Sequence, residues 1–458
     1  MTPTTYAPEF ERATFSKVAW RLIPFLFLCY IVAFLDRVNV GFAKLQMAGE
    51  LNFSDSMYSL GAGIFFIGYF IFEVPSNVIL EKVGARIWIA RIMITWGIIS
   101  SAFMYTGVMH WGPVPAWFNC SDAEFTFYLL RFLLGVAEAG FFPGIILYLT
   151  YWFPSARRAK MVAMFMTAIA ISNVIGSPVS GGIMQYMDGA NGWRGWQWLF
   201  LLEGIPSVII GVLVFILLDN GPGAAKWLTQ PEKDLVLGRI AEDDATKTVL
   251  GERHNLLDAF KDGRVWALSV VYFTGVVGFY AVSFWMPTIV QELGIDKKEL
   301  FKVGLISMIP WGIAAVAMVV VGGHSDRTGE RRWHSAGSLL VAMVGLLALA
   351  MIGHAAVASI IALTLVTSGI LCWVATFWSL PTAFLTGTAA AAGIAWINSV
   401  GNLGGYVGPI LIGQLRDATH STEAAFYALA GIALIGALII ILLPRTQVRA
   451  AAVPVPAV

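Results

Sequence analysis

The stretch Arg131-Phe132-Leu133-Leu134-Gly135-Val136-Ala137-Glu138 places a cation and a carboxylate inside an apolar run that extends from Phe125 to Leu149. At this spacing on a helix, the two side chains share a face and are separated by about 10 Å of rise. A charged residue inside a membrane span is by default a sign of a functional site. The first question is therefore whether this run lies in a membrane.

The composition of the chain places the run in a membrane. Hydrophobic residues make up 58% of the sequence and charged residues 12%, whereas an average soluble domain carries about 25% charged residues. The mean hydropathy is +0.75. Because one helical span needs about 20 apolar residues, the chain has room for about a dozen spans. The prediction is an all-α polytopic membrane protein with little sequence left for a soluble domain.

The apolar runs fall into two groups of six, separated by a polar stretch. The first group comprises residues 18–40, 57–80, 87–108, 125–150, 161–187 and 196–218, and the second comprises residues 265–290, 303–321, 336–352, 357–385, 391–415 and 425–443. We therefore predict twelve transmembrane helices. They form an N-terminal six-helix half at residues 1–218 and a C-terminal six-helix half with its tail at 265–458, joined by a central cytoplasmic loop at 219–264.

Lysine and arginine are distributed unevenly over the connecting segments. If both termini are cytoplasmic, the cytoplasmic segments hold 21 of the 29 Lys and Arg residues, and the segments on the opposite side hold 6. Cytoplasmic loops of membrane proteins carry an excess of these residues. The distribution therefore predicts that both termini lie in the cytoplasm.

A short pattern recurs in two of the cytoplasmic connections. The first reads Glu81-Lys82-Val83-Gly84-Ala85-Arg86 and the second Asp326-Arg327-Thr328-Gly329-Glu330-Arg331, so that an acid, a base, a glycine and an arginine recur in register. Two six-helix halves with a long linker describe the major facilitator architecture, whose halves are related by an axis along the membrane normal. The alternative is that both connections are merely short basic turns, which the orientation rule alone would produce.

The charged residues predicted inside spans all lie in the first half of the chain. They are Asp36, Arg37, Glu73, Arg131, Glu138 and Glu203, whereas Arg21 and Arg91, near the ends of their runs, are counted with the cytoplasmic segments. A charge at the centre of a bilayer costs about 2.5 to 3.5 kcal/mol on insertion scales, so the signs should balance. Arg37 and Arg131 can balance Asp36 and Glu138. The uneven distribution indicates that the two halves have different tasks.

A cavity lined by two arginines and two carboxylates is close to neutral, and protonation of one carboxylate leaves it positive. This is a physical basis for coupling a proton to an anion, because burial and a neighbouring arginine act in opposite directions on a carboxylate's proton affinity. All six histidines lie in loops or at span ends. Asp36 and Glu138 are therefore the predicted proton-coupling residues.

Other roles remain open for the same residues. Arg131 and Glu138 could form a structural ion pair. Adjacent residues point about 100° apart on a helix, so at most one of Asp36 and Arg37 faces a cavity squarely. Glu73, near the cytoplasmic end of its span, is more consistent with a structural role, and Glu203 lies near an interface.

The spans of the second half contain hydroxyl, amide and aromatic groups instead of charges. Trp378 and Ser379 lie in the tenth run, and Asn398 and Asn402 share a helical face in the eleventh. Such groups can stack on or hydrogen-bond to an organic substrate without charging the site. Packing is the alternative for the aromatic residues, whereas the two amides need partners if they are buried.

Several function classes are excluded or disfavoured. The chain has no phosphate-binding glycine-rich loop that ends in Lys-Ser or Lys-Thr, which argues against ATP-driven transport. It has no cluster of His, Cys and Asp at metal-ligand spacing, and its three cysteines form no framework. We predict no enzyme activity, no cofactor, no metal and no nucleic-acid partner. Ion-coupled transport is the class that remains.

The chain resembles the anion:cation symporter family of the major facilitator superfamily over nearly its whole length. The resemblance rests on these stretches: 34–39 (FLDRVN), 68–77 (GYFIFEVPSN), 131–144 (RFLLGVAEAGFFPG), 151–154 (YWFP), 196–206 (WQWLFLLEGIP) and 325–332 (SDRTGERR). The segment 171–178 (ISNVIGSP), which contains Asn173, is most similar to the branch of tartrate transporters, whose relatives include carriers of phthalate, hydroxyphenylacetate and other aromatic acids.

This resemblance implies an inner-membrane permease that works by alternating access and takes up a proton together with an organic anion. It associates Asp36 and Glu138 with the proton, and Arg37, Tyr69, Arg131 and the region of Asn398 with the substrate. It also implies that the two repeated loops act in gating, through Glu81, Lys82, Gly84, Arg86, Asp326, Arg327, Gly329 and Arg331. The first loop departs from the superfamily pattern, because Asn77 replaces the usual glycine and Glu81-Lys82 the usual Asp-Arg.

The sequence therefore predicts a proton-coupled importer of a small organic carboxylate, most consistent with a hydroxylated dicarboxylate such as tartrate or a sugar acid. Substrate contacts are expected from Arg37, Tyr69, Arg131, Asn173, Trp378, Ser379, Asn398 and Asn402. We expect a monomer in the lipid bilayer. One alternative is a permease for an aromatic acid, favoured if Trp and Phe line the second-half wall. The other is a sensor with a transporter fold that binds ligand without flux.

Overall fold

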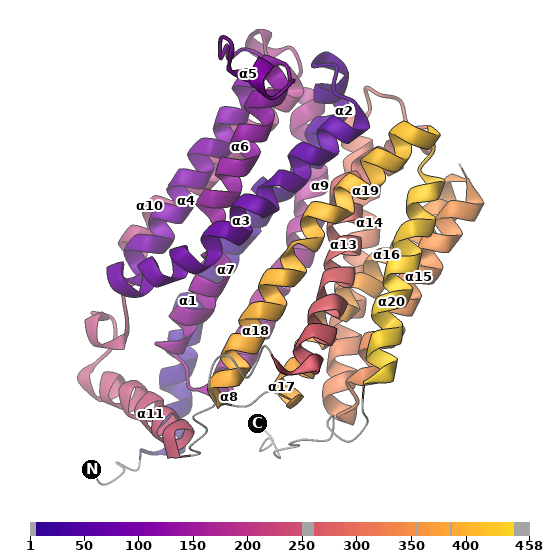
Figure 1. Cartoon of the computed structure of the whole chain (residues 1–458). Coiled ribbons are helices and arrows are strands. Elements are labelled where there is room, and N and C mark those ends of the chain that lie inside the picture. The colour runs from indigo at the N-terminus through magenta and orange to yellow at the C-terminus, as the bar shows by residue number, and fades with distance from the viewer. Residues whose placement is uncertain (1–5, 250–260, 354, 385–386, 444–458) are drawn as a thin grey trace.

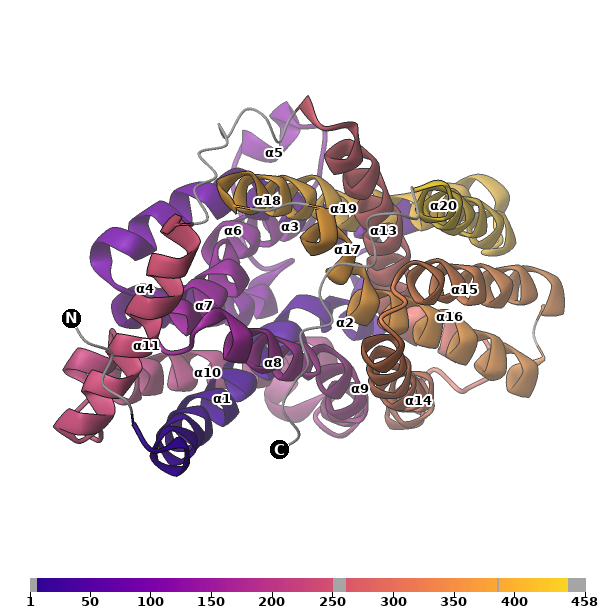
Figure 2. The same cartoon turned by 90° about the horizontal axis from the view of Figure 1, so that it is seen from below.

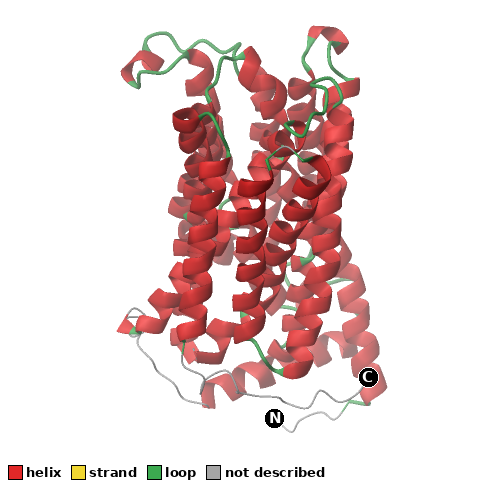
Figure 3. Cartoon of the chain, turned by 90° about the vertical axis from the view of Figure 1, so that its right-hand side faces the viewer, coloured by secondary structure: helices red, strands yellow, loops and turns green. Residues whose placement is uncertain are grey.

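The computed structural model describes residues 6–249, 261–353, 355–384 and 387–443, and within these ranges all regular structure is helical (Figure 3). Residues 250–260 of the predicted central loop and the predicted C-terminal tail at 444–458 lie outside the described residues. Most of the long helices contain about 20 residues or more, which is the length that a helix needs to cross a bilayer. These lengths agree with those of the apolar runs.

The helices of the first half precede a polar connection, and those of the second half follow it (Figure 1). The first half contains α1 (Pro8–Val38), α2 (Val40–Glu50), α3 (Asp55–Val83), α4 (Ala85–Ala102), α5 (Val114–Trp117), α6 (Asp122–Glu138), α7 (Phe141–Thr150), α8 (Ser155–Met166), α9 (Ala168–Tyr186) and α10 (Gly195–Leu217). The connection contains α11 (Gln230–Val249), and the second half contains α13 (Gly263–Gln291), α14 (Leu300–Thr328), α15 (Arg332–Ile352), α16 (Ala356–Phe377), α17 (Ser379–Phe384), α18 (Gly387–Asn402), α19 (Gly404–Thr419) and α20 (Glu423–Leu442).

Eleven helical segments of the described residues are long and apolar enough to cross a membrane. They correspond to eleven of the twelve predicted runs. The remaining run, predicted at 391–415, is occupied by α18 and α19, which have 16 residues each and meet at Leu403. The two follow one another along a single line across the molecule (Figure 1).

The fourth predicted run is likewise divided into two helices, and the division matters for the site. α6 ends at Glu138, and α7 begins at Phe141. Between them, Gly140 has φ 84°, a left-handed conformation that glycine adopts without strain. A Cβ on Gly140 would also overlap the Ser76 side chain of α3. The break therefore places Glu138 at the last turn of α6, in the middle of the segment that spans the membrane.

The two halves lie side by side, and their most extensive contacts are between α9 and α14, α3 and α19, and α2 and α13 (Figures 1 and 2). The backbones of α9 and α14 approach closely, because Gly181 and Gly304 present no side chain. A Cβ on Gly181 would overlap the carbonyl oxygen of Leu300, and one on Gly304 would overlap that of Ser177. Small residues at such crossings are typical of helix packing in membranes.

The central connection packs against the first half instead of forming a free loop. Glu232 of α11 pairs with Lys17 of α1 at 2.8 Å, and Arg239 pairs with Glu11 at 2.7 Å. Partial desolvation raises the pKa of the Glu232 carboxyl, but the hydrogen bonds from Lys17 and Thr229 outweigh this effect and keep the pKa below its usual value. The carboxylate therefore remains ionised near neutral pH, and the contact is lost only on acidification.

The two repeated loops share a backbone conformation at their glycine, but their arginine side chains have different partners. Gly84, with φ 94°, ends α3, and Gly329, with φ 68°, ends α14, so the repeated glycine meets a positive φ in both places. In the first loop, Arg86 Nε donates to the carbonyl oxygen of Phe215 at 2.6 Å. In the second loop, Arg331 pairs with Asp326. The side chains of the remaining members, Glu81, Lys82 and Arg327, are exposed.

The close approach of α9 and α14 gives a test of the packing. Gly304→Ala should lower the melting temperature of the purified protein, because the added methyl group meets backbone atoms that cannot move aside. Overpacking of this kind costs about 1 to 3 kcal/mol. Gly312→Ala on the same helix is the matched control, since the nearest atom to its new Cβ is 3.9 Å away. Equal melting temperatures for the two variants would contradict the predicted contact.

Candidate substrate site

A cavity of about 70 Å³ lies between the two halves. Helices α1, α3, α7, α8 and α9 contribute its first-half wall, and α13, α16 and α18 contribute most of its second-half wall. The lining residues are Tyr30, Phe34, Arg37, Phe65, Phe66, Tyr69, Phe142, Met166, Ile169, Tyr272, Val276, Phe279, Tyr280, Trp373, Val374, Trp378, Asn398 and Asn402. Eleven of these eighteen residues are aromatic, and Arg37 is the one charged residue among them.

The Arg37 guanidinium is held by partners from both halves. Nη2 donates to Glu138 Oε1, and Nη1 donates to the hydroxyl oxygen of Tyr280 on α13 at 2.7 Å. The guanidinium carbon lies 5.4 Å from the centroid of the Phe65 ring and 5.7 Å from that of the Tyr69 ring. Glu138 is only 1% exposed. Arg37 is thus a cation that is surrounded by aromatic rings and paired with one carboxylate.

Asp36 points away from the cavity, as its position next to Arg37 on a helix requires. Its carboxylate accepts hydrogen bonds from Trp96 Nε1 at 3.0 Å, from Ser100 Oγ at 2.7 Å and from Ser207 Oγ. Trp96 and Ser100 belong to α4 and Ser207 to α10. Asp36 therefore joins three helices of the first half and does not touch the space that a substrate would occupy.

Arg131 also lies outside the cavity, which differs from the expectation that it contacts substrate. Its side chain is fully buried, and it donates to the carbonyl oxygens of Gly61 at 3.3 Å and Ala62 at 3.0 Å on α3. Its guanidinium carbon lies 5.2 Å from the Phe65 ring centroid. The salt bridge of the site joins Arg37 to Glu138. Arg131 and Glu138 are about 10 Å apart along the axis of α6. Glu138 therefore lies beside the last turn of α1, which contains Arg37, and Arg131 lies beside the first part of α3.

The remaining predicted contacts divide into two groups. Tyr69, Trp378, Asn398 and Asn402 line the cavity together with Arg37. Ser379 is not among the lining residues, and its hydroxyl donates to the carbonyl oxygen of Thr376 at 2.6 Å. Asn173 belongs to a different cavity.

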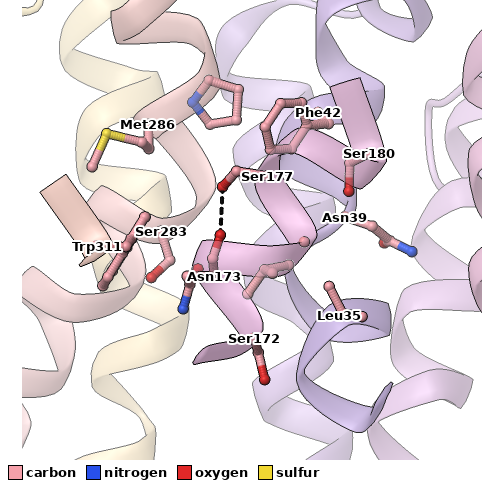
Figure 4. Close-up of a pocket in the computed structure, with 13 residues that line it drawn as sticks. Leu35, Asn39, Phe42, Ser172, Asn173, Ser177, Ser180, Ser283, Met286 and Trp311 are labelled. Carbon is pink, nitrogen blue, oxygen red and sulfur yellow. Dashed lines mark hydrogen bonds between the residues drawn. The ribbon is translucent and has the colours of Figure 1, made fainter. Parts of the chain in front are cut away.

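That second cavity has a volume of about 20 Å³, which is enough for about one water molecule. Figure 4 shows Asn173, Ser177 and Ser180 of α9 on one side and Ser283, Met286 and Trp311 of the second half opposite them. The Nδ2 atom of Asn173 donates to the carbonyl oxygen of Ile169 at 2.9 Å. The geometry therefore gives Asn173 a place at the interface of the halves, away from Arg37.

Charged residues join the halves at the end of the bundle where α2, the start of α3 and the end of α19 meet (Figure 1). Asp55 of the first half accepts from Lys44 Nζ at 2.7 Å and from Arg416 Nε at 2.9 Å. Arg416 also pairs with Glu292 at 2.7 Å, and Lys44 Nζ lies 3.6 Å from a ring centroid of Trp285. We call Lys44, Asp55, Trp285, Glu292 and Arg416 the end cluster. It lies opposite the end at which α1 begins and α20 finishes.

Several residues of the site are absent from the sequence prediction. Tyr280 is bonded to Arg37, and Tyr272 lies in the second-half wall. Aromatic residues make up 13% of the chain, and no local sequence pattern distinguishes these two tyrosines from the others. The sequence identifies Glu73 as a carboxylate within a span, but it does not identify the partner of Glu73 in the other half. Glu73 accepts a hydrogen bond from Asn398 Nδ2 at 2.9 Å across the two halves.

Comparison with known proteins agrees with this architecture. The sequence profile described as Major Facilitator Superfamily matches residues 26–409. The chain belongs to this superfamily. It is a transporter by family and not an enzyme.

Relatives of known name cover almost all of the chain. A protein of Agrobacterium vitis with the name "Putative tartrate transporter" is 47% identical over 442 residues, which are 96% of this chain and 94% of that protein. A protein of Pseudomonas putida, named as metabolite transport protein NicT, is 43% identical over 438 residues, which are 96% of each chain. The assignment to a branch that resembles the anion:cation symporters agrees with these names.

Among solved structures, the xylose transporter XylE from E. coli in a partially occluded inward open conformation has a TM-score of 0.70 at 15% identity. The match covers 93% of this chain and 99% of that one. At this identity the likeness shows the fold alone. The fold is thus the major facilitator fold that the sequence predicted.

The different surroundings of the two arginines lead to a test. Arg131→Gln should lower the melting temperature of the purified protein by removing charge-assisted hydrogen bonds, each of which contributes about 1.5 to 3 kcal/mol. The rise in melting temperature on addition of a carboxylate ligand should be the same in Arg131→Gln as in the wild-type protein. Arg37→Gln is the matched substitution and should abolish the stabilisation by ligand. A thermal-shift measurement in which Arg131→Gln alone removed the ligand effect would contradict this placement.

Proposed function

We propose that this chain is a proton-coupled symporter that imports a small organic carboxylate anion by alternating access. The observation that carries the proposal is the buried pair of Arg37 and Glu138 beside a cavity between the two halves. Arg37 is the one cation that an anion in this cavity can meet among its lining residues. The names of the relatives, which include tartrate transporters, support the anionic substrate.

The pair offers a simple route to coupling. While Glu138 is ionised, it neutralises Arg37, and a second anion gains little by approaching. A proton on Glu138 removes that compensation, so a substrate carboxylate becomes the favourable partner of the guanidinium. Release of the substrate and of the proton restores the original pair. Glu138 is therefore the proposed site at which proton and substrate are linked.

Asp36 is the proposed second proton site. Its three hydrogen-bond donors come from α4 and α10, so a change in its protonation alters contacts between those helices and α1. Because Asp36 precedes Arg37 directly, the change is transmitted to the guanidinium through the backbone. In this proposal Asp36 acts on the arrangement of the half, whereas Glu138 acts on the charge of the cavity.

Alternating access requires the two halves, residues 1–218 and 265–458, to move against each other. The end cluster holds them together at one end of the bundle, and this end is the extracellular one if both termini are cytoplasmic, as the Lys and Arg distribution indicates. The loops of Gly84 and Gly329 then face the cytoplasm, where their arginine contacts serve as the proposed gating elements. We propose a monomer in the inner membrane, since each chain contains a complete cavity.

The identity of the acid has two candidates. A hydroxylated dicarboxylate such as tartrate is supported by the names of two relatives. An aromatic acid is supported by the cavity itself, because its second-half wall contains Tyr272, Phe279, Tyr280, Trp373 and Trp378 beside two amides. Aromatic side chains favour flat, apolar ligands through stacking and area burial.

Coupling can be measured in proteoliposomes. Uptake of the transported acid should rise with an inwardly directed pH gradient and should concentrate the acid. Glu138→Gln should lose accumulation and its dependence on the gradient, while exchange of labelled for unlabelled acid persists. Accumulation by Glu138→Gln at the wild-type level would contradict the coupling role. A wild-type protein that bound an acid and showed neither uptake nor exchange would instead be a sensor.

A thermal-shift panel separates the two substrate candidates. The melting temperature of the purified protein is measured at increasing concentrations of tartrate, sugar acids and aromatic carboxylates, which gives an apparent affinity for each. If stacking contributes about 1.4 kcal/mol or more, Trp378→Ala should weaken the affinity for aromatic acids at least tenfold more than the affinity for tartrate. An equal loss for both classes would show that the aromatic wall does not select the substrate.

A further inference from the structure

Glu73 is a buried carboxylate that the proposed transport mechanism does not use. It lies on α3, one helical turn after Tyr69, and its exposure is 5%. Its Oε1 atom accepts a hydrogen bond from Nδ2 of Asn398, which belongs to α18 in the other half. Asn398 lines the substrate cavity, and Glu73 does not. The carboxylate is thus one step removed from the substrate.

The chemistry of this contact determines how the amide is oriented. An ionised carboxylate only accepts hydrogen bonds, so it must face the N–H side of an asparagine amide. One N–H group of Asn398 is therefore committed to Glu73. The carbonyl oxygen Oδ1, with two lone pairs, and a single N–H remain for other partners. Rotation of the amide by 180° would place Oδ1 against the carboxylate, which two acceptors do not tolerate.

The charged and the amide residues of the cavity come from opposite halves. Arg37 of the first half is the cation among the lining residues, and Asn398 and Asn402 provide amides from the second half. Since no further Lys or Arg is among the lining residues, a group that binds at Asn398 has no cation to meet there. A hydrogen-bond donor on the ligand, by contrast, finds the oriented carbonyl oxygen of Asn398.

We propose that Glu73 is a positioning residue that orients the Asn398 amide, so that the site selects carboxylates carrying a hydroxyl group or another hydrogen-bond donor that faces Asn398. This inference rests on the proposed function, because it assumes that a carboxylate occupies Arg37. It applies to both substrate candidates, since a hydroxylated dicarboxylate and a hydroxylated aromatic acid each carry such a donor.

The test compares acids that differ only in their hydroxyl groups, two in the first pair and one in the second. Binding of tartrate and of succinate, and of 4-hydroxyphenylacetate and of phenylacetate, is measured on the purified full-length protein by isothermal titration or thermal shift. The wild-type protein should prefer the hydroxylated member of the pair that it binds by about tenfold or more, because a site built to hydrogen-bond a hydroxyl group rejects the analogue that lacks it.

Glu73→Gln should reduce this preference to about threefold or less, because a glutamine amide can donate as well as accept and no longer forces one orientation of Asn398. Affinity for the acid without the hydroxyl group should stay within about twofold, since its carboxylate still binds Arg37. Glu73→Asp keeps an acceptor-only group and should restore at least part of the preference. A merely structural role would weaken both members of a pair equally.

Glu203→Gln is the matched control. Glu203 is also 5% exposed and accepts a hydrogen bond from Ser180 at 2.7 Å, but Glu203 is remote from Asn398 in the fold and is not a cavity residue. Its substitution should leave the hydroxyl preference unchanged. A preference that survives in Glu73→Gln, or that falls equally in Glu203→Gln, would overturn the positioning role. If the wild-type protein binds none of the carboxylates, the proposed function itself fails, which is a different result.

Discussion

The salt bridge between Arg37 and Glu138 holds α1 against α6 inside the membrane, and the arrangement of the site follows from it. Two opposite charges removed from water are stable only when they meet each other and when their remaining hydrogen-bonding capacity is used. Glu138 accepts from Arg37, and Arg37 donates to Glu138 and to Tyr280, whereas its Nε atom is buried without a hydrogen-bond partner. Because Tyr280 belongs to the second half, the pair also connects the two halves at the level of the cavity.

Breaks in the helices give this pair its place. The left-handed Gly140 ends α6 immediately beyond Glu138, and α1 ends at Val38, immediately beyond Arg37. Side chains at helix ends have more freedom of approach than those in a continuous helix. In the second half, α18 and α19 meet at Leu403, directly after Asn402. The backbone of Leu403, like that of Asn39 between α1 and α2, stays in the right-handed helical region, so Gly140 is the position among these three where the helical geometry is lost.

The two halves contribute unlike chemistry to one cavity. Both halves provide aromatic rings, but the charged residue Arg37 comes from the first half and the two amides come from the second half. Such a division lets the charge of the site change with protonation while the second wall keeps its shape and its hydrogen-bonding pattern. The link from Glu73 to Asn398 is the exception, because it sets the orientation of a second-half amide from the first half.

The sequence by itself determined the class of fold and the inventory of charges. Hydropathy and helical periodicity are local properties, so the span pattern, the two groups of six and the repeated glycine loops could be predicted from them, and eleven of the predicted spans recur as helices of membrane length. The restriction of intramembrane charge to the first half was visible for the same reason, and so was the expectation that at most one of the neighbouring residues Asp36 and Arg37 faces a cavity squarely.

Only the tertiary structure decided which of these groups meet. Arg131 and Glu138 share a helix face in the sequence, yet Glu138 pairs with Arg37, and Arg131 donates to backbone carbonyl groups of α3. Tyr280 joins the site from a residue 243 positions away from Arg37. A single sequence carries the period of each helix but not the rotation and depth at which helices pack, and a buried charge takes the partner that those two quantities bring within reach.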